Sequence, residues 1–267
     1  MKAVLTIANW NVQRISPSQA RATRIRDYCE AVDADIWILT EAHEDFAPKE
    51  GYFSVVSGTP DRVSNPGEKW SAIWSKWPIE ILDDYVTHAS RCVAWRITGS
   101  PFGHIIIYAT VLPWKTDSRA KQSSSFQAFA DAVNVQKFDW LNIQRDFPRA
   151  ALILAGDFNQ GLAPWHYYGS KRKRAVLEGA LVESNLIALT AMGDDPIARD
   201  SDPMACIDHI CISASGDWEL ESTMRWPETQ RPLAPLSDHF GVRIQLSFEG
   251  KESGNKTSKT TNGVSFD

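Results

Sequence analysis

The feature that most constrains the fold is an uninterrupted apolar run at positions 150–155, AALILA, followed directly by Gly156 and Asp157. A short run of this kind is typical of a strand covered on both faces, because a half-exposed strand would alternate apolar and polar side chains. A second apolar run, IWIL, follows Asp35 within the strand expected at residues 35–39. A chain with such strands needs layers of other elements on both sides of a sheet.

Turn signals such as Thr59-Pro60 and Ser100-Pro101 divide the chain into short strands and three helices. We expect helices after Pro17 with Ser18 as the N-cap, at residues 120–144, and within residues 174–184. We expect strands at residues 3–10, 35–39, 52–57, 70–75, 81–86, 92–97, 104–112, 150–155, 206–213, 218–226 and 239–248. Many strands with interspersed helices indicate a layered α/β or α+β domain.

Composition limits the class of protein. Of 267 residues, 43% are hydrophobic and 23% charged, as in a globular domain, and the four cysteines form no CxxC pair that would suggest a zinc site. We expect one domain over residues 1–249 and a flexible tail over 250–267, where apolar residues are almost absent. The sequence has no apolar stretch of membrane-spanning length and no secretory pattern, so we expect a cytoplasmic protein without membrane contact. The net charge of −5 gives no global attraction to nucleic acid, although a local basic rim or a metal could supply it.

Polar residues stand where several apolar strands begin or end. Any one of them alone is more simply explained as a strand cap or a turn. Together they could converge at one edge of a sheet sandwich, with oxygen ligands for Mg²⁺ and a donor for a phosphate oxygen. These residues are Asn9, Asn11, Glu41, Asp157, Asn159, Asp208, Asp238 and His239.

Six motifs occur in a characteristic order: WNVQ (10–13), ILTE (38–41), SAIWSKWPI (71–79), AGDFNQ (155–160), IDHI (207–210) and SDHFGV (237–242). On these motifs the chain resembles the endonuclease/exonuclease/phosphatase superfamily, also called the deoxyribonuclease-I-like fold. The resemblance implies an α/β fold, a four-layer α/β/β/α sandwich of two packed mixed sheets with outer helices. It also implies an active site at one edge of the paired sheets, within a catalytic domain that covers residues 1–249.

The resemblance also implies a role for each matched residue. Glu41 corresponds to the principal Mg²⁺ (or Mn²⁺) ligand, with Asn11 nearby and Asp238 close to the metal. Asp157 corresponds to the residue that orients or deprotonates the attacking water. Asn159 and His239 correspond to donors to the phosphate, and Asp208 to the partner of the imidazole of His239.

Departures from the family pattern narrow the subfamily. Val111 stands where many members carry a histidine that assists the leaving group, and Lys115 or Tyr108 could substitute for it. The chain also lacks the tyrosine and the acidic residue (here Gln13) of abasic-site endonucleases. His209 replaces the arginine that inositol polyphosphate 5-phosphatases carry after the aspartate.

Two basic stretches could contact a substrate. One consists of Lys171, Arg172, Lys173 and Arg174, and it follows the aromatic cluster Trp165, His166, Tyr167 and Tyr168. Basic residues beside stacking residues can bind a nucleic-acid strand. The second stretch lies near Asn11 and includes Arg14. The alternative for both is a solvated surface.

These observations predict a Mg²⁺- or Mn²⁺-dependent hydrolase of phosphoester bonds, a nuclease that acts on DNA or RNA. Two alternatives stay open. The protein could hydrolyse a small phosphoester such as a lipid head group, a sugar phosphate or a nucleotide. It could instead be a catalytically weak binding protein of the same fold, with Val111 as the only support for that alternative.

Overall fold

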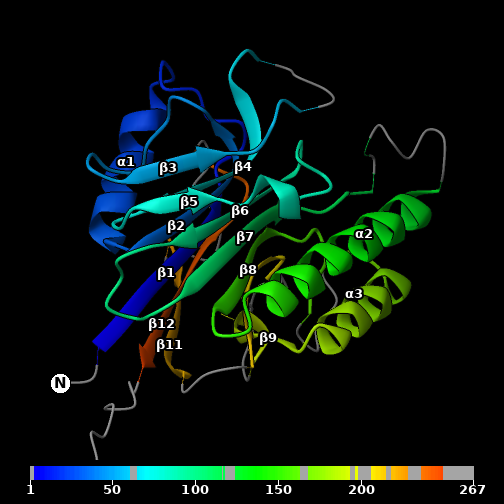
Figure 1. The fold of residues 1–267 in the computed structure, drawn as a ribbon. Helices are drawn as coiled ribbons and strands as arrows, with labels where there is room; N and C mark the ends of the chain where they lie inside the picture. The colour runs from blue at the N-terminus through cyan, green and yellow to red at the C-terminus, as the bar shows by residue number, and fades with distance from the viewer. Residues whose placement is uncertain are drawn as a thin grey trace, which may run out of the picture.

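The computed structural model describes residues 3–60, 65–115, 117, 124–162, 168–192, 196–197, 206–214, 218–227 and 236–248. Within them, two six-stranded sheets are packed face to face (Figure 1). Sheet A has the order β11 (Trp218–Trp226), β12 (Gly241–Phe248), β1 (Ala3–Asn11), β2 (Ile36–His43), β4 (Glu68–Ser75), β3 (Phe53–Val56). Sheet B has the order β5 (Ile79–Ile81), β6 (Cys92–Ile97), β7 (Ile105–Val111), β8 (Ala151–Asp157), β10 (Asp208–Ser213), β9 (Leu186–Ala188).

Both sheets are mixed, as expected. In sheet A only β1 and β2 are parallel, and in sheet B only β7 and β8 are parallel. The other neighbours are antiparallel, so β10 and β12 begin at the edges where β8 and β1 end.

Strand alternation explains the apolar run at residues 150–155. In β8 the side chains of Ala151, Ile153 and Ala155 face the core between the sheets, while Leu152 and Leu154 face the helices. Every residue of β8 is buried. The strand is therefore covered on both faces, as its composition predicted.

Helices cover the outer faces. Helix α1 (Arg21–Val32) packs on sheet A, and α2 (Ser125–Asp146) and α3 (Lys171–Glu183) pack on sheet B, on the opposite side of the molecule in Figure 1. The four-layer α/β/β/α sandwich is thus confirmed. No helix within the described part of the chain is long and apolar enough to cross a membrane.

Several local predictions were wrong. Helix α1 has Ala20 at its N-cap, because the hydroxyl of Ser18 bonds instead to that of Ser16. The strand expected at residues 81–86 ends at Ile81 and is followed by a 3₁₀ turn, η1 (Asp83–Tyr85), since consecutive aspartates favour a turn. The edge strand β9 was not expected at all. The expected tail at 250–267 and residues 120–123 of the second helix lie outside the described residues.

Candidate active site

The predicted site residues meet at one edge of the two sheets. Asn11 ends β1, Asp157 ends β8, and Glu41 lies near the end of β2. Asp208 begins β10 directly opposite Asp157, and His239 lies just before β12. Parallel strands end where their antiparallel neighbours begin, so residues far apart in sequence share this edge.

Asn9 joins the sheets below this edge. Its buried side-chain amide donates to the carbonyl of Gly156 at 3.0 Å and to that of His209 at 3.3 Å. One side chain of sheet A therefore bonds to two strands of sheet B. Asn9 positions the sheets rather than presenting a reactive group.

The central cluster consists of Asp157, Asp208 and His239, whose potential ligand atoms all lie within 4.8 Å of one another. His239 Nδ1 and Asp208 Oδ2 are hydrogen-bonded at 2.6 Å. Asn11 Nδ2 donates to Asp157 Oδ2 at 3.1 Å and to Glu41 Oε1 at 3.2 Å. The structure thus brings five predicted site residues into one continuous network.

Unusual backbone conformations concentrate at this edge. Of six non-glycine residues with positive φ among those described, four belong to it: Gln13, Arg14, Glu41 and Asn159. The other two, Asp33 and Asn185, follow helices, where a left-handed residue is ordinary. Left-handed conformations of non-glycine residues cost free energy and accumulate where a side chain must be aimed.

The charged groups of the central cluster shift one another's pKa values. Burial, together with the neighbouring carboxylate of Asp208, raises the pKa of Asp157 to about 7. Burial also raises the pKa of Asp208, against the opposing effect of His239. Burial alone would lower the pKa of His239, but Asp208 and Asp157 outweigh it and raise that pKa to about 10. The two carboxylates therefore favour the protonated form of the imidazole.

Glu41 lies next to this cluster and pairs with Arg14. Burial raises the pKa of Glu41, and the hydrogen bond from Asn11 opposes that rise. Arg14 Nε lies 3.3 Å from Glu41 Oε2 and 3.4 Å from Glu68 Oε1. The Arg14 side chain is 42% exposed, so it lies at the rim of the site.

The residues present fit a hard divalent cation. Carboxylate oxygens are its preferred ligands, and Asp208 Oδ1 is buried without a hydrogen-bond partner. Asn11 turns its nitrogen to the carboxylates, while its oxygen accepts from the amide of Gln13 at 2.8 Å. Asp238 is exposed and outside the close cluster, although its charge acts on Asp208 and His239.

Asn159 is close to the cluster but buried. Its side-chain amide nitrogen does not bond to the central cluster. It donates instead to the carbonyl of Leu112 at 3.0 Å. Its backbone N–H donates to Asp157 Oδ1 at 2.9 Å. It therefore fixes both the Asp157 side chain and the segment that follows β7.

The two groups considered as substitutes for the missing histidine differ in position. Val111 itself is fully buried beside Asp157, and the hydroxyl of Tyr108 donates to Asp139 of α2 at 2.8 Å, so Tyr108 does not reach this edge. Lys115 is exposed. Burial raises the pKa of Tyr168, and the negative charge of Asp157 adds to that rise.

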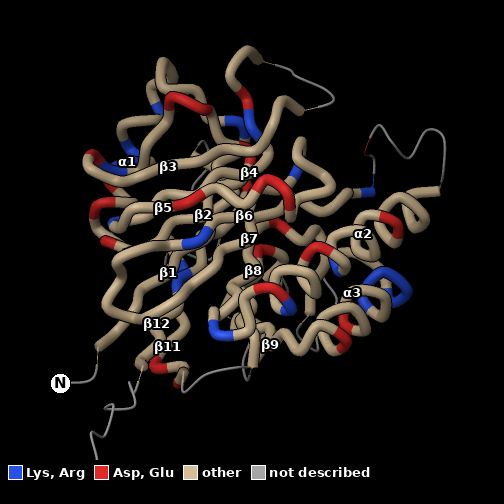
Figure 2. Tube along the Cα trace, viewed as in Figure 1, with Lys and Arg blue, Asp and Glu red and all other residues tan. Residues whose placement is uncertain are grey.

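The basic residues 171–174 form the first turn of α3, which begins at Lys171 (Figure 2). Lys173 is buried, with its ammonium 2.9 Å from Ser125 Oγ, and Arg174 pairs with Glu178 at 2.6 Å. Arg172 lies over the ring of Phe126, and Lys171 is exposed. The described contacts of these residues are thus with α2, α3 and the segment before it. Of the neighbouring aromatic cluster, residues 165–167 lie outside the described residues.

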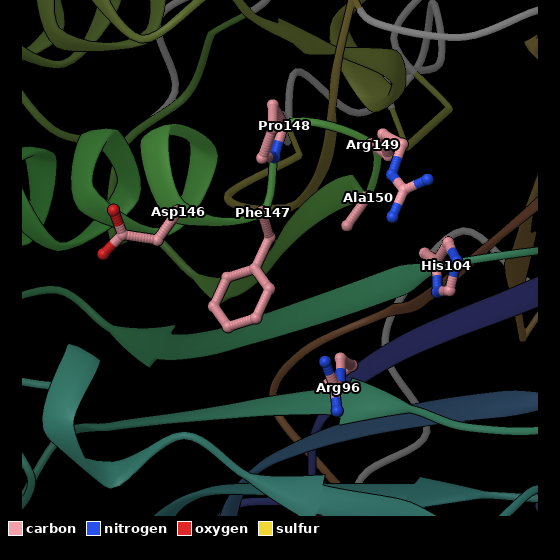
Figure 3. Close-up of a pocket in the computed structure, with 7 residues that line it drawn as sticks. All are labelled: Arg96, His104, Asp146, Phe147, Pro148, Arg149 and Ala150. Atoms are coloured by element: carbon pink, nitrogen blue, oxygen red, sulfur yellow. The ribbon is translucent and has the colours of Figure 1, made fainter.

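A separate hollow of about 130 Å³ lies at the opposite end of sheet B (Figure 3). Arg96, His104 and Arg149 line it together with the end of α2. It is near the beginnings of β7 and β8, whereas the carboxylate cluster is at their ends. Its lining contains no group of carboxylates, so it is not the candidate active site.

A family model for the endonuclease/exonuclease/phosphatase family matches residues 8–239, which include every residue of the cluster. The chain belongs to the endonuclease/exonuclease/phosphatase family. Among curated protein sequences, none matches it significantly.

Several solved structures share the fold of this chain. An endonuclease/exonuclease/phosphatase from Beutenbergia cavernae is 18% identical, with a TM-score of 0.64, over 92% of this chain and 72% of that one. An AP endonuclease from Archaeoglobus fulgidus is 18% identical, with a TM-score of 0.62, over 90% of this chain and 98% of that one. The endonuclease domain of TRAS1, a telomere-specific non-LTR retrotransposon, is 16% identical, with a TM-score of 0.57, over 91% and 98%. At these identities the likeness shows the deoxyribonuclease-I-like fold of this family member.

Proposed function

We propose that this family member is a metal-dependent phosphodiesterase that cleaves DNA or RNA. The observation that carries the proposal is the Asp157, Asp208 and His239 cluster, with ligand atoms within 4.8 Å, beside the Asn11–Glu41 pair. Two structural neighbours are described as endonucleases, which supports a polynucleotide substrate. The cytoplasmic location expected from the sequence stays a prediction.

The residues divide the work as follows. Glu41, with Asn11 and Asp238 nearby, would bind Mg²⁺ or Mn²⁺, which supplies charge neutralisation at the phosphate and at the departing oxygen. Asp157 accepts a proton from the attacking water, and its raised pKa makes it a better base near neutral pH than an ordinary aspartate. His239, cationic through Asp208, donates from Nε2 to a non-bridging phosphate oxygen.

Asn159 completes the set of phosphate donors in this proposal. It donates to Leu112 in the structure, so it must exchange that bond for one to the phosphate, or act by fixing Asp157. The four basic residues Lys171, Arg172, Lys173 and Arg174 are proposed as outer contacts to the strand. Arg14, which lies at the rim of the site beside Glu41, is the better placed cation.

Product analysis tests the proposal. Purified protein is incubated with Mg²⁺ or Mn²⁺ and end-labelled oligonucleotides, and in parallel with a panel of small phosphomonoesters. We expect shortened labelled strands without release of inorganic phosphate, and no reaction with a chelator. Release of inorganic phosphate from small esters alone would contradict the nuclease proposal and favour a phosphatase. No turnover on any substrate would favour the binding-protein alternative.

A further inference from the structure

A cluster of two tryptophans and two arginines extends from the candidate site. Trp70 of β4 and Trp114, which follows β7, have ring centroids 5.4 Å apart. The Arg91 guanidinium lies 5.6 Å from each centroid, and that of Arg14 lies 5.6 Å from the ring of Trp70. We call these four residues the Trp–Arg wall.

Each end of the wall is linked to a residue of the candidate site. At one end Arg14 bonds to Glu41. At the other end Trp114 stands two residues after Leu112, whose N–H donates to the Asp157 carbonyl at 2.9 Å and whose carbonyl accepts from Asn159. The wall therefore runs from sheet A to sheet B along the candidate site.

Arg91 fixes the segment that carries Trp114. Its guanidinium donates to the Val111 carbonyl at 3.3 Å and forms a buried ion pair with Asp117. The Asp117 N–H in turn donates to the Trp114 carbonyl at 3.4 Å. Arg91 and Asp117 are both about 4% exposed or less, so removing either partner would leave a buried charge without its counter-ion. These bonds hold the backbone of the segment, and Arg91 and Trp70 pack against the Trp114 ring itself.

The exposed parts of the wall differ from its buried parts. Trp70 and Arg91 are each 4% exposed, whereas Trp114 is half-buried and the Arg14 side chain is 42% exposed. The exposed groups of the wall are therefore part of the Trp114 indole and the Arg14 side chain, which pairs with Glu41. A nucleotide carries the complementary pair, a base that stacks and a phosphate that is anionic.

Given the proposed function, we propose that Trp114 stacks on an unpaired base next to the scissile phosphate while Arg14 contacts the adjoining phosphate. The substrate is then a single strand, or a duplex with an unpaired nucleotide at the cleavage point. In a continuous duplex the faces of each base are already covered by its neighbours, and unstacking costs a few kcal/mol.

The test compares two strands with the same phosphates. One is a fluorescent deoxythymidine decamer and the other is an abasic decamer with the same backbone, bound in chelator at low salt so that neither is cleaved. We expect the wild type to bind the thymidine strand about 10-fold tighter, the size of one base–aromatic stack. Trp114→Ala should lose this preference, Trp114→Phe should retain most of it, and Phe138→Ala, an exposed ring on α2, should leave it unchanged.

Equal binding of the two strands by the wild type, a preference that survives in Trp114→Ala, or no binding of either strand would each overturn the subsite. Cleavage with Mg²⁺ is measured separately. Base preference without cleavage would support the Trp114 subsite and contradict the proposed phosphodiesterase function. Cleavage without base preference would support the proposed function and contradict the subsite.

Discussion

Asp208, which is hydrogen-bonded to His239, is the strongest of the groups that favour the protonated imidazole. Because the pKa of His239 is raised above its ordinary 6.5 to about 10, the folded state binds this proton more tightly than the unfolded state. The pair therefore contributes stability that is complete below pH 6.5 and is lost as the pH rises toward 10. We expect NMR of the ring nitrogens, in chelator, to show a protonated His239 at pH 8.

Asp208→Asn should lower that pKa toward 6.5, while Asp139→Asn, which removes a buried carboxylate bonded to Tyr108, should leave it unchanged. A wild-type His239 that titrates near 6.5 would contradict this account of the pair.

The proposed metal site depends on the charge of the Glu41 carboxylate. Glu41→Gln keeps the shape and the hydrogen bond from Asn11 but removes the charge. We expect Mg²⁺ affinity, measured by calorimetry, to fall by at least about 10-fold, the loss seen even for groups that only support a ligand. Glu80→Gln, whose parent carboxylate pairs with Arg96 at the far end of sheet B, is the control. Equal affinities of wild type and Glu41→Gln would remove Glu41 from the proposed metal site.

At the scale of elements, the junction of β7 and β8 determines where Asp157 points. Gly156 has a φ of +143°, and a Cβ there would lie 1.9 Å from the Thr110 carbonyl oxygen. Since backbone on both strands would have to move, we expect Gly156→Ala to lower the free energy of unfolding by about 3 kcal/mol or more. Gly179→Ala should instead stabilise α3 by about 0.5–1 kcal/mol, because its Cβ meets nothing within 4 Å. Urea unfolding of both variants checks this, and a neutral Gly156→Ala would show that the junction is not strained.

The same scale shows what sequence patterns can and cannot predict. The apolar run of β8 predicted a strand covered on both faces, because burial alone determines its composition. The end of the strand at 81 was missed, because the turn over Asp83 competes locally with a β-rich pattern. The residues of the cluster could be predicted because they stand at the ends of apolar strands. The link that Asn9 makes between the sheets, and the contact of Arg91 with Trp70, depend on tertiary packing and cannot be predicted from a local sequence pattern.

At the scale of the whole molecule, the net charge of −5 means that attraction to a polyanion must be local. The exposed start of α3 is one such place, since Lys173 and Arg174 are bonded internally but Lys171 and Arg172 are more exposed. If they contact two phosphates, the double substitution Lys171→Gln and Arg172→Gln should reduce the slope of log K against log salt by about 1.4 for a single strand. Lys137→Gln, on α2 and paired with Glu183, is the control. An unchanged slope would show that Lys171 and Arg172 are a solvated surface that does not contact the substrate.

The measurement that tests the central claim most directly compares the wild type with Asp157→Asn, His239→Ala and His104→Ala. Each is incubated with Mg²⁺ or Mn²⁺ and labelled single- and double-stranded DNA and RNA, and folding is checked by circular dichroism. We expect wild type and His104→Ala, altered at the far end of sheet B, to cleave a strand. Loss of the base or of the cationic donor should reduce kcat by about 10²–10⁴-fold with the fold intact. Wild-type rates in folded Asp157→Asn and His239→Ala would contradict the claim that this edge of the sandwich is the active site.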